Sequence, residues 1–157
     1  MEKVKRVIFL DMHGTTRAPM AAEIMKTVIK RDNIKSSLEI LARGIVVHFP
    51  EPINQKAEAV LAGNGIIVSN YVSKAFFDEE VDEKTLVFTF DERLRHIILK
   101  EYEVLNEENT YVLSFFVGEE LETFDPLGEP IGTYGLCYEA LKETTRKLLK
   151  KLGELDE

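Results

Sequence analysis

The sequence predicts a doubly wound α/β fold, in which a parallel sheet lies between two layers of helices (αβα). Short apolar runs rich in β-branched residues recur along the chain, as expected for buried parallel strands. A helical pattern follows most of these runs, and strands that alternate with helices form parallel βαβ units. A chain of 157 residues with 45% hydrophobic residues suffices for one packed core. We therefore expect residues 1–157 to form a single domain.

The expected strands and helices alternate along the chain. Pro19 stands in the first turn of the first predicted helix, where proline is tolerated. Asp91 is the predicted N-cap of a later helix. The predicted strands are 4–10, 38–42, 86–90 and 111–113, and the predicted helices are 18–30, 52–64, one that begins after Asp91, and 132–152. From the last helix, the residues expected to face the core are Leu136, Ala140, Leu141, Leu148 and Leu149.

The composition excludes several classes of function. The formal net charge is −8, which argues against binding of nucleic acid or of a membrane surface, since both require basic surface. No apolar run reaches the roughly 20 residues that cross a bilayer. The single cysteine, Cys137, excludes an internal disulfide and a cysteine-based metal cluster. We expect a cytoplasmic protein in which Cys137 is a buried packing residue.

Candidate chemistry is concentrated in the segment DMHGTTR, from Asp11 to Arg17. The segment lies between the first predicted strand and its helix, at the carboxyl end of the sheet, where doubly wound folds bind ligands. A loop of this length can direct several backbone N–H groups at one anion, and the positive end of the following helix adds to the attraction. The guanidinium of Arg17 can bind two phosphate oxygens. The alternative is an ordinary strand–loop–helix turn with an exposed arginine.

The order of several motifs resembles the low-molecular-weight protein tyrosine phosphatase family over residues 4–152. That family opens with a strand, a Cys-x5-Arg-Ser-Pro loop and a helix that begins Met-Ala-Glu. Here five residues separate Asp11 from Arg17, and APMAAE follows. The family's Asp-Pro pair before the last helix is matched by Asp125-Pro126, and RGIVV, KAEAVLAGNGI, VSNYVSKAF and LVFTFDERLR follow the family's order between these motifs. The resemblance implies the three-layer α/β fold of this phosphatase family.

The resemblance also implies a role for each matching residue. In the family, a cysteine thiolate attacks phosphorus, the arginine binds the phosphate, and the aspartate protonates the leaving group. Arg17 is then the phosphate-binding arginine and Asp125 the general acid. Asp11 stands at the position of the nucleophilic cysteine.

Three further positions near the loop depart from the family pattern. His13 replaces a glycine, Gly14 replaces an asparagine that braces the loop, and Ala18 replaces a hydroxyl residue that stabilises the thiolate. Because the changes cluster, the first hypothesis is an inactive or impaired phosphatase, a pseudophosphatase. It would need no cofactor and would still bind phosphate or a phosphorylated protein residue. The phosphate-binding residues are then Met12, His13, Gly14, Thr15, Thr16 and Arg17.

A second hypothesis makes Asp11 the nucleophile of an active phosphomonoesterase, directed at phosphotyrosine or phosphoarginine. A carboxylate can attack phosphorus, but two unit charges about 4 Å apart repel by roughly 4 kcal/mol at an effective dielectric of about 20. Enzymes that use aspartate in this way normally recruit Mg²⁺. VIFLDMHGTT does resemble the haloacid-dehalogenase motif Asp-x-Asp-Gly-Thr. However, His13 stands at the second aspartate, and Mg²⁺ prefers oxygen ligands. Mg²⁺ is expected only under this alternative.

A third possibility is that Asp11 serves as an internal anion. Its carboxylate would accept hydrogen bonds from the loop amides and from Arg17, in the manner of a bound phosphate. The domain would then be a folded, catalytically silent binding module. A purely structural domain that binds a partner and has no phosphate affinity is the remaining alternative.

Two apolar residues are candidates for the rim of the substrate pocket. Phe49 lies where the family places residues that grip the substrate side chain, and Leu127 follows the Asp-Pro pair. The alternative is that both residues cover the sheet edge. Thr15 resembles the threonine that separates a protein-arginine-phosphatase branch from tyrosine-directed members, although a small residue is also what a tight loop tolerates.

Overall fold

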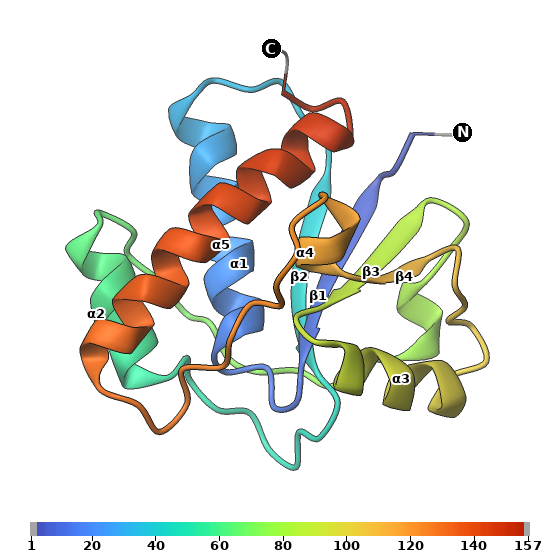
Figure 1. The fold of residues 1–157 in the computed structure, drawn as a ribbon, viewed down its shortest axis with the longest axis horizontal. Coiled ribbons are helices and arrows are strands. Elements are labelled where there is room, and N and C mark those ends of the chain that lie inside the picture. Colours follow the sequence, from blue (N-terminus) through green and yellow to red (C-terminus); the bar gives the residue numbers. More distant parts are fainter. Residues whose placement is uncertain (1–2, 156–157) are drawn as a thin grey trace.

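A parallel sheet of four strands forms the centre of the computed structural model, which describes residues 3–155 (Figure 1). The strand order is β2-β1-β3-β4, and all three pairings are parallel. The α/β class that the sequence predicts is therefore confirmed. The strands are β1 (Arg6–Asp11), β2 (Glu39–Gly44), β3 (Thr85–Thr89) and β4 (Thr110–Val112).

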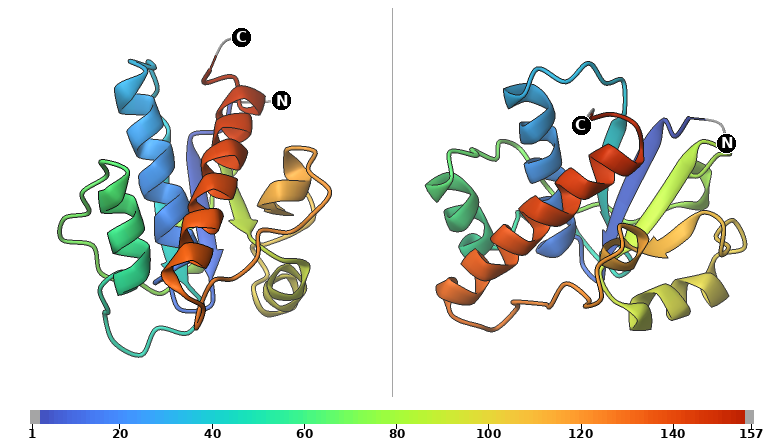
Figure 2. Two further views of the ribbon diagram at one scale, coloured as in Figure 1. Left: turned by 60° about the vertical axis from the view of Figure 1, so that its left-hand side comes forward. Right: turned by 45° about the horizontal axis from the view of Figure 1, so that its top comes forward.

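Helices cover both faces of this sheet, as Figure 2 shows from two further directions. On one face, α5 packs against α1 and α2, and α1 packs against β1 and β2. On the other face, α3 packs against β3 and β4. Among the described residues, no helix has both the length and the apolar character needed to cross a membrane. The helices are α1 (Arg17–Arg31), α2 (Gln55–Gly63), the 3-10 helix η1 (Asp78–Glu80), α3 (Glu92–Glu101), α4 (Leu113–Phe116) and α5 (Ile131–Lys151).

The central strand supplies both hydrophobic cores. Val7 and Phe9 point into the core formed with α1 and α5, whereas Ile8 and Leu10 point into the core formed with α3. All four side chains are fully buried. This explains why β1 reads as a continuous apolar run, since a parallel strand covered on both faces has no solvent side.

Most element boundaries differ from the prediction by one to three residues, and two of these differences bear on the site. The second strand continues to Gly44 instead of ending at residue 42, because Arg43 and Gly44 still pair with Leu10 and Asp11 of β1. The second helix begins at Gln55 instead of residue 52, because the side chain of Asn54 caps it by accepting hydrogen bonds from two backbone N–H groups. The strand pairing thus carries β2 to the same sheet edge as Asp11.

The prediction that Leu136 of the last helix faces the core is wrong. Leu136 is 65% exposed, whereas Tyr134, Cys137 and Tyr138 are buried on α5 together with Leu141. The buried positions follow the i, i+3, i+4 spacing of one helix face, and Leu136 lies outside it. Cys137 is buried, as predicted.

Candidate functional site

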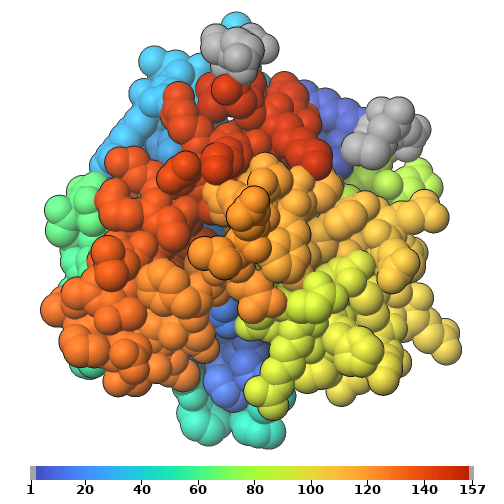
Figure 3. All heavy atoms as spheres, viewed as in Figure 1, coloured from blue at the N-terminus to red at the C-terminus, as the bar shows by residue number. Residues whose placement is uncertain are grey.

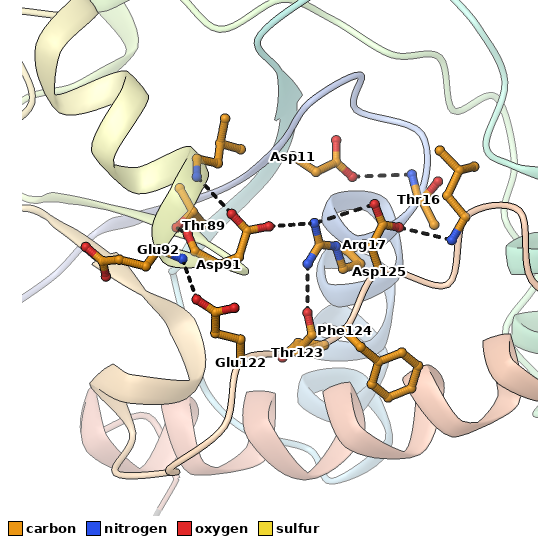
Figure 4. A network of polar contacts seen from close by, with 12 residues as sticks. Asp11, Thr16, Arg17, Thr89, Asp91, Glu92, Glu122, Thr123, Phe124 and Asp125 are labelled. Carbon is orange, nitrogen blue, oxygen red and sulfur yellow. Dashed lines mark hydrogen bonds and ion pairs between the residues drawn. The ribbon is translucent and has the colours of Figure 1, made fainter.

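The loop after β1 lies at the carboxyl end of the sheet, beside the ends of the neighbouring strands. Asp11 is the last residue of β1, Gly44 the last of β2, and Asp91 follows β3 closely. Figure 4 shows Asp91 and Asp125 approaching Arg17 from different segments, with Asp11 nearby. The fold therefore gathers three carboxylates near one guanidinium.

The carboxylate of Asp11 points into the loop that begins with it. The residue is only 5% exposed. One oxygen accepts a hydrogen bond from the N–H of Gly14, and the other accepts from the N–H of Thr16 at 3.3 Å and of Ala18 at 2.9 Å. Burial raises the pKa of Asp11 above its ordinary value, although these amides and Arg17 act in the opposite direction. The loop amides thus already surround an anionic group of the chain itself.

Two glycines and a tyrosine hold the loop in its curved shape. Gly14 has a φ of 72°, in the left-handed region that favours glycine. Its carbonyl accepts a hydrogen bond of 2.6 Å from the hydroxyl of Tyr71, and burial raises the pKa of this tyrosine, so it remains a donor. A Cβ on Gly44 would lie 2.5 Å from the carbonyl carbon of His13. No local sequence signal marks Tyr71 or Gly44 as a support of the loop, because both contacts join segments that are far apart in the chain.

The guanidinium of Arg17 binds acceptors from other loops. Its Nη1 donates to the carbonyl oxygen of Thr123 at 2.7 Å, and its Nη2 donates to Oδ2 of Asp91 at 3.1 Å. The guanidinium carbon also lies 5.3 Å from the ring centre of Phe90. Within residues 3–155, the acceptors of Arg17 do not include Asp11. The hypothesis that Asp11 binds both the loop amides and Arg17 is therefore right for the amides and wrong for the arginine, which has nearer acceptors.

A polar network joins Arg17 to the start of α3. While Oδ2 of Asp91 binds Arg17, its Oδ1 accepts from the N–H of Leu94 at 2.8 Å and caps α3, as predicted. A carboxylate oxygen of Glu122 accepts from the N–H of Glu92 at 2.7 Å. The β1–α1, β3–α3 and α4–α5 loops are thus tied together (Figure 4).

Asp125 faces Arg17 from the α4–α5 loop. Its side chain is 50% exposed, and its Oδ2 lies 3.8 Å from Nη2 of Arg17. Oδ1 accepts a hydrogen bond of 3.1 Å from the N–H of Leu127. Behind this loop, burial raises the pKa of the Cys137 thiol to about 12, so the thiol is neutral. Cys137 is therefore unsuited to act as a nucleophile.

Two adjoining cavities open at this edge. The first, of about 250 Å³, is lined by Asp11, Arg17 and Asp125 together with Met12, His13, Thr15, Thr16 and Leu127. The second, of about 410 Å³, shares His13, Thr15 and Leu127 and includes Phe49. Phe49 and Leu127 are 67% and 54% exposed. His13 places Nδ1 3.0 Å from the carbonyl oxygen of Val46. The predicted rim residues therefore do border the cavities.

A family model and two relatives match nearly the whole of this chain. The family model for low molecular weight phosphotyrosine protein phosphatase matches residues 6–156. The chain is 25% identical over 151 residues to the protein-arginine-phosphatase of Bacillus subtilis (strain 168), covering 93% of this chain and 95% of the relative. It is also 25% identical over 150 residues to the low molecular weight protein-tyrosine-phosphatase PtpB of Staphylococcus haemolyticus (strain JCSC1435), covering 96% of each.

Solved structures give the same fold. The YwlE arginine phosphatase from Geobacillus stearothermophilus superimposes with a TM-score of 0.83 at 25% identity, covering 95% of this chain and 93% of that one. The low molecular weight protein tyrosine phosphatase from T. tengcongensis gives a TM-score of 0.85 at 26% identity, covering 93% and 98%. Both likenesses extend over nearly the whole of each chain.

Proposed function

Because the chain belongs to the low molecular weight phosphotyrosine protein phosphatase family, we propose that it is a pseudophosphatase of that family, in which Asp11 takes the place of the nucleophilic cysteine. The observation that carries this proposal is the buried Asp11 carboxylate, which accepts the amides of Gly14, Thr16 and Ala18. A carboxylate in this position supplies no thiolate. We therefore expect cysteine-type hydrolysis to be absent or severely impaired.

The same carboxylate opposes the binding of phosphate. Two unit charges about 4 Å apart repel by roughly 4 kcal/mol at an effective dielectric of about 20, and a phosphate dianion is repelled more strongly. The amides that bind Asp11 are also unavailable to a ligand. Phosphate affinity should therefore be low while Asp11 is ionised and should rise when its charge is removed.

The remaining parts of the site suit a phosphate or a phosphorylated side chain on a partner protein. Arg17 lies at the cavity of about 250 Å³ and supplies the fixed positive charge. Asp125 faces it and would act as the general acid in an active relative, but without a nucleophile it has no step to assist. Phe49 and Leu127 would border the ligand's side chain.

The similarity to both an arginine phosphatase and a tyrosine phosphatase leaves two candidate phosphoresidues. Thr15 lines both cavities and would border either ligand. Under the alternative function, Asp11 would be the nucleophile of an active phosphomonoesterase, with Mg²⁺ as cofactor. Both oxygens of Asp11 accept backbone amides, and no group of three His, Cys, Asp or Glu side chains in residues 3–155 forms a candidate metal cluster. These residues as they stand do not fit Mg²⁺.

The test is hydrolysis of p-nitrophenyl phosphate with Mg²⁺ and with EDTA, together with calorimetric titration of inorganic phosphate. We expect no turnover by the wild-type chain and turnover by Asp11→Cys. Asp11→Asn should remain inactive but bind phosphate at least about tenfold more tightly, because it removes a like charge. Asp32→Asn removes a carboxylate that pairs with Arg146 on the surface and is the control, with unchanged phosphate affinity. Wild-type turnover that needs Mg²⁺ and vanishes in Asp11→Asn would refute the proposal and establish the alternative.

A further inference from the structure

We propose that a second surface, which shares no lining residue with the cavities at Asp11, docks a basic amphipathic segment of a partner protein. The surface is a hollow of about 520 Å³ between segment 119–124 and α5, called the α5 groove below. From α5 it is lined by Ala140, Glu143, Thr144 and Lys147. Figure 3 shows this face of the molecule, with segment 119–124 in orange beside α5 in orange to red.

Large apolar side chains along this groove are exposed to solvent. Leu121 is 81% exposed and Phe124 is 42% exposed. Leu136, which is 65% exposed, lies on α5 one turn before Ala140 and extends the apolar strip. Apolar side chains gathered on one surface, with polar groups around them, are typical of a site that binds another chain. The unexpected exposure of Leu136 has a reason if this strip is a contact surface.

The negative charge around the apolar strip favours a partner with basic side chains. The lining includes four glutamates and one lysine. Lys147 binds Glu119 at 2.9 Å and lies 3.4 Å from Glu143, whereas Glu120 is exposed. The groove therefore presents a surplus of negative charge that arginine or lysine side chains would pair with.

The same charge excludes other occupants. A second copy of this chain, whose formal net charge is −8, would be repelled, as would nucleic acid and anionic lipid. A helix or extended segment with leucines on one face and basic residues beside them satisfies both the apolar strip and the glutamates. Such a segment would rest on the chain that holds Arg17, since the carbonyl of Thr123 accepts from that guanidinium.

The experiment is a fluorescence anisotropy titration of a labelled synthetic peptide in which leucines at helical spacing alternate with arginines. We expect saturable binding that weakens at least about tenfold in Glu120→Lys/Glu143→Lys, because two attractive charges become repulsive. Leu121→Ser should weaken binding by about threefold or more. All three side chains are exposed, so the variants should fold, and thermal unfolding verifies this.

Two controls separate groove binding from attraction to the net charge. Glu107→Lys/Glu108→Lys makes the same charge change in a loop away from the groove and should alter affinity by less than about twofold. A peptide of equal charge with serines in place of leucines should bind much more weakly. The proposal would be overturned if the groove variant and the control variant lost the same affinity, if the two peptides bound equally well, or if binding did not saturate. These outcomes do not depend on whether Asp11 replaces the nucleophile.

Discussion

At the residue scale, Asp11 is surrounded by donors and shielded from water, and these two conditions shift its pKa in opposite directions. Three backbone amides and Arg17 favour the carboxylate, whereas burial favours the neutral acid and prevails, so the pKa lies above the ordinary value of 3.8. The folded chain then binds this proton more tightly than the unfolded chain does. The stability contributed by the bound proton is present at low pH and is lost as the pH rises through the folded pKa.

This sign gives a prediction for pH dependence. The free energy of unfolding of the wild type, relative to Asp11→Ser, should fall as the pH rises above the ordinary pKa of 3.8 and through the raised pKa of folded Asp11. Urea unfolding at a series of pH values measures the difference. Asp82→Ser is the control, because the backbone N–H of Lys84 and the hydroxyl of Thr85 lower the pKa of Asp82. Stability from Asp82 is present above the ordinary pKa and is lost as the pH falls through the folded pKa. The prediction would be contradicted if the free energy of unfolding of the wild type, relative to Asp11→Ser, rose with pH.

Sequence patterns predicted part of the site and missed the rest for a physical reason. Arg17 and Asp125 could be singled out because their residue types and spacing match a family motif. Asp11 could be singled out because it stands at the cysteine position of that motif, and the fold brings all three residues to one cavity. Thr123 could not, since it acts through its carbonyl oxygen, which every residue carries. The direction of the Arg17 side chain could not be predicted either, because it depends on acceptors that lie 106 and 74 residues away in the chain.

At the element scale, Asp91 links a helix cap to the site. One oxygen caps α3 through the N–H of Leu94, and the other binds Arg17. The N-cap was predictable because aspartate before a helical pattern is a local signal. The bond to Arg17 was not, since it joins two segments that only the sheet order places side by side. In the same way, strand periodicity predicted β2 but not its extension to Gly44, which depends on pairing with β1.

Two substitutions separate the two roles of Asp91. Asp91→Ala removes both the cap and the bond to Arg17, whereas asparagine is also a good N-cap and removes only the charge beside Arg17. We expect Asp91→Ala to lower the free energy of unfolding by about 1 kcal/mol more than Asp91→Asn does, this being the typical value of a cap. Chemical denaturation of both variants measures the difference. Equal losses would mean that the side chain contributes nothing as a cap and that the observed bond to Leu94 is of no consequence for α3.

At the scale of the whole molecule, Arg17 joins the two sides of the sheet. It begins α1 on one face, binds Asp91 at the start of α3 on the other, and also holds the α4–α5 loop through Thr123. The two hydrophobic cores lie on opposite faces of the strands, since Val7 and Phe9 belong to one and Ile8 and Leu10 to the other. The arginine that is proposed to bind phosphate therefore also links the two sides of the sheet through its protein acceptors.

Replacing Arg17 with methionine keeps the volume of the side chain but removes its donors. The side chain of Arg17 is 8% exposed and that of Asp91 is 28% exposed. Without the guanidinium, the carbonyl of Thr123 and one oxygen of Asp91 would lose their donor at a place where little water can replace it. We expect the free energy of unfolding to fall by about 2–3 kcal/mol. Arg146→Met is the matched control, since Arg146 pairs with Asp32 where both side chains are exposed, at 56% and 41%, and such pairs contribute about 0–1 kcal/mol. Urea unfolding of the two variants gives the comparison. Similar small losses in the two variants would contradict the prediction and would show that Arg17 is held in place without stabilising the fold.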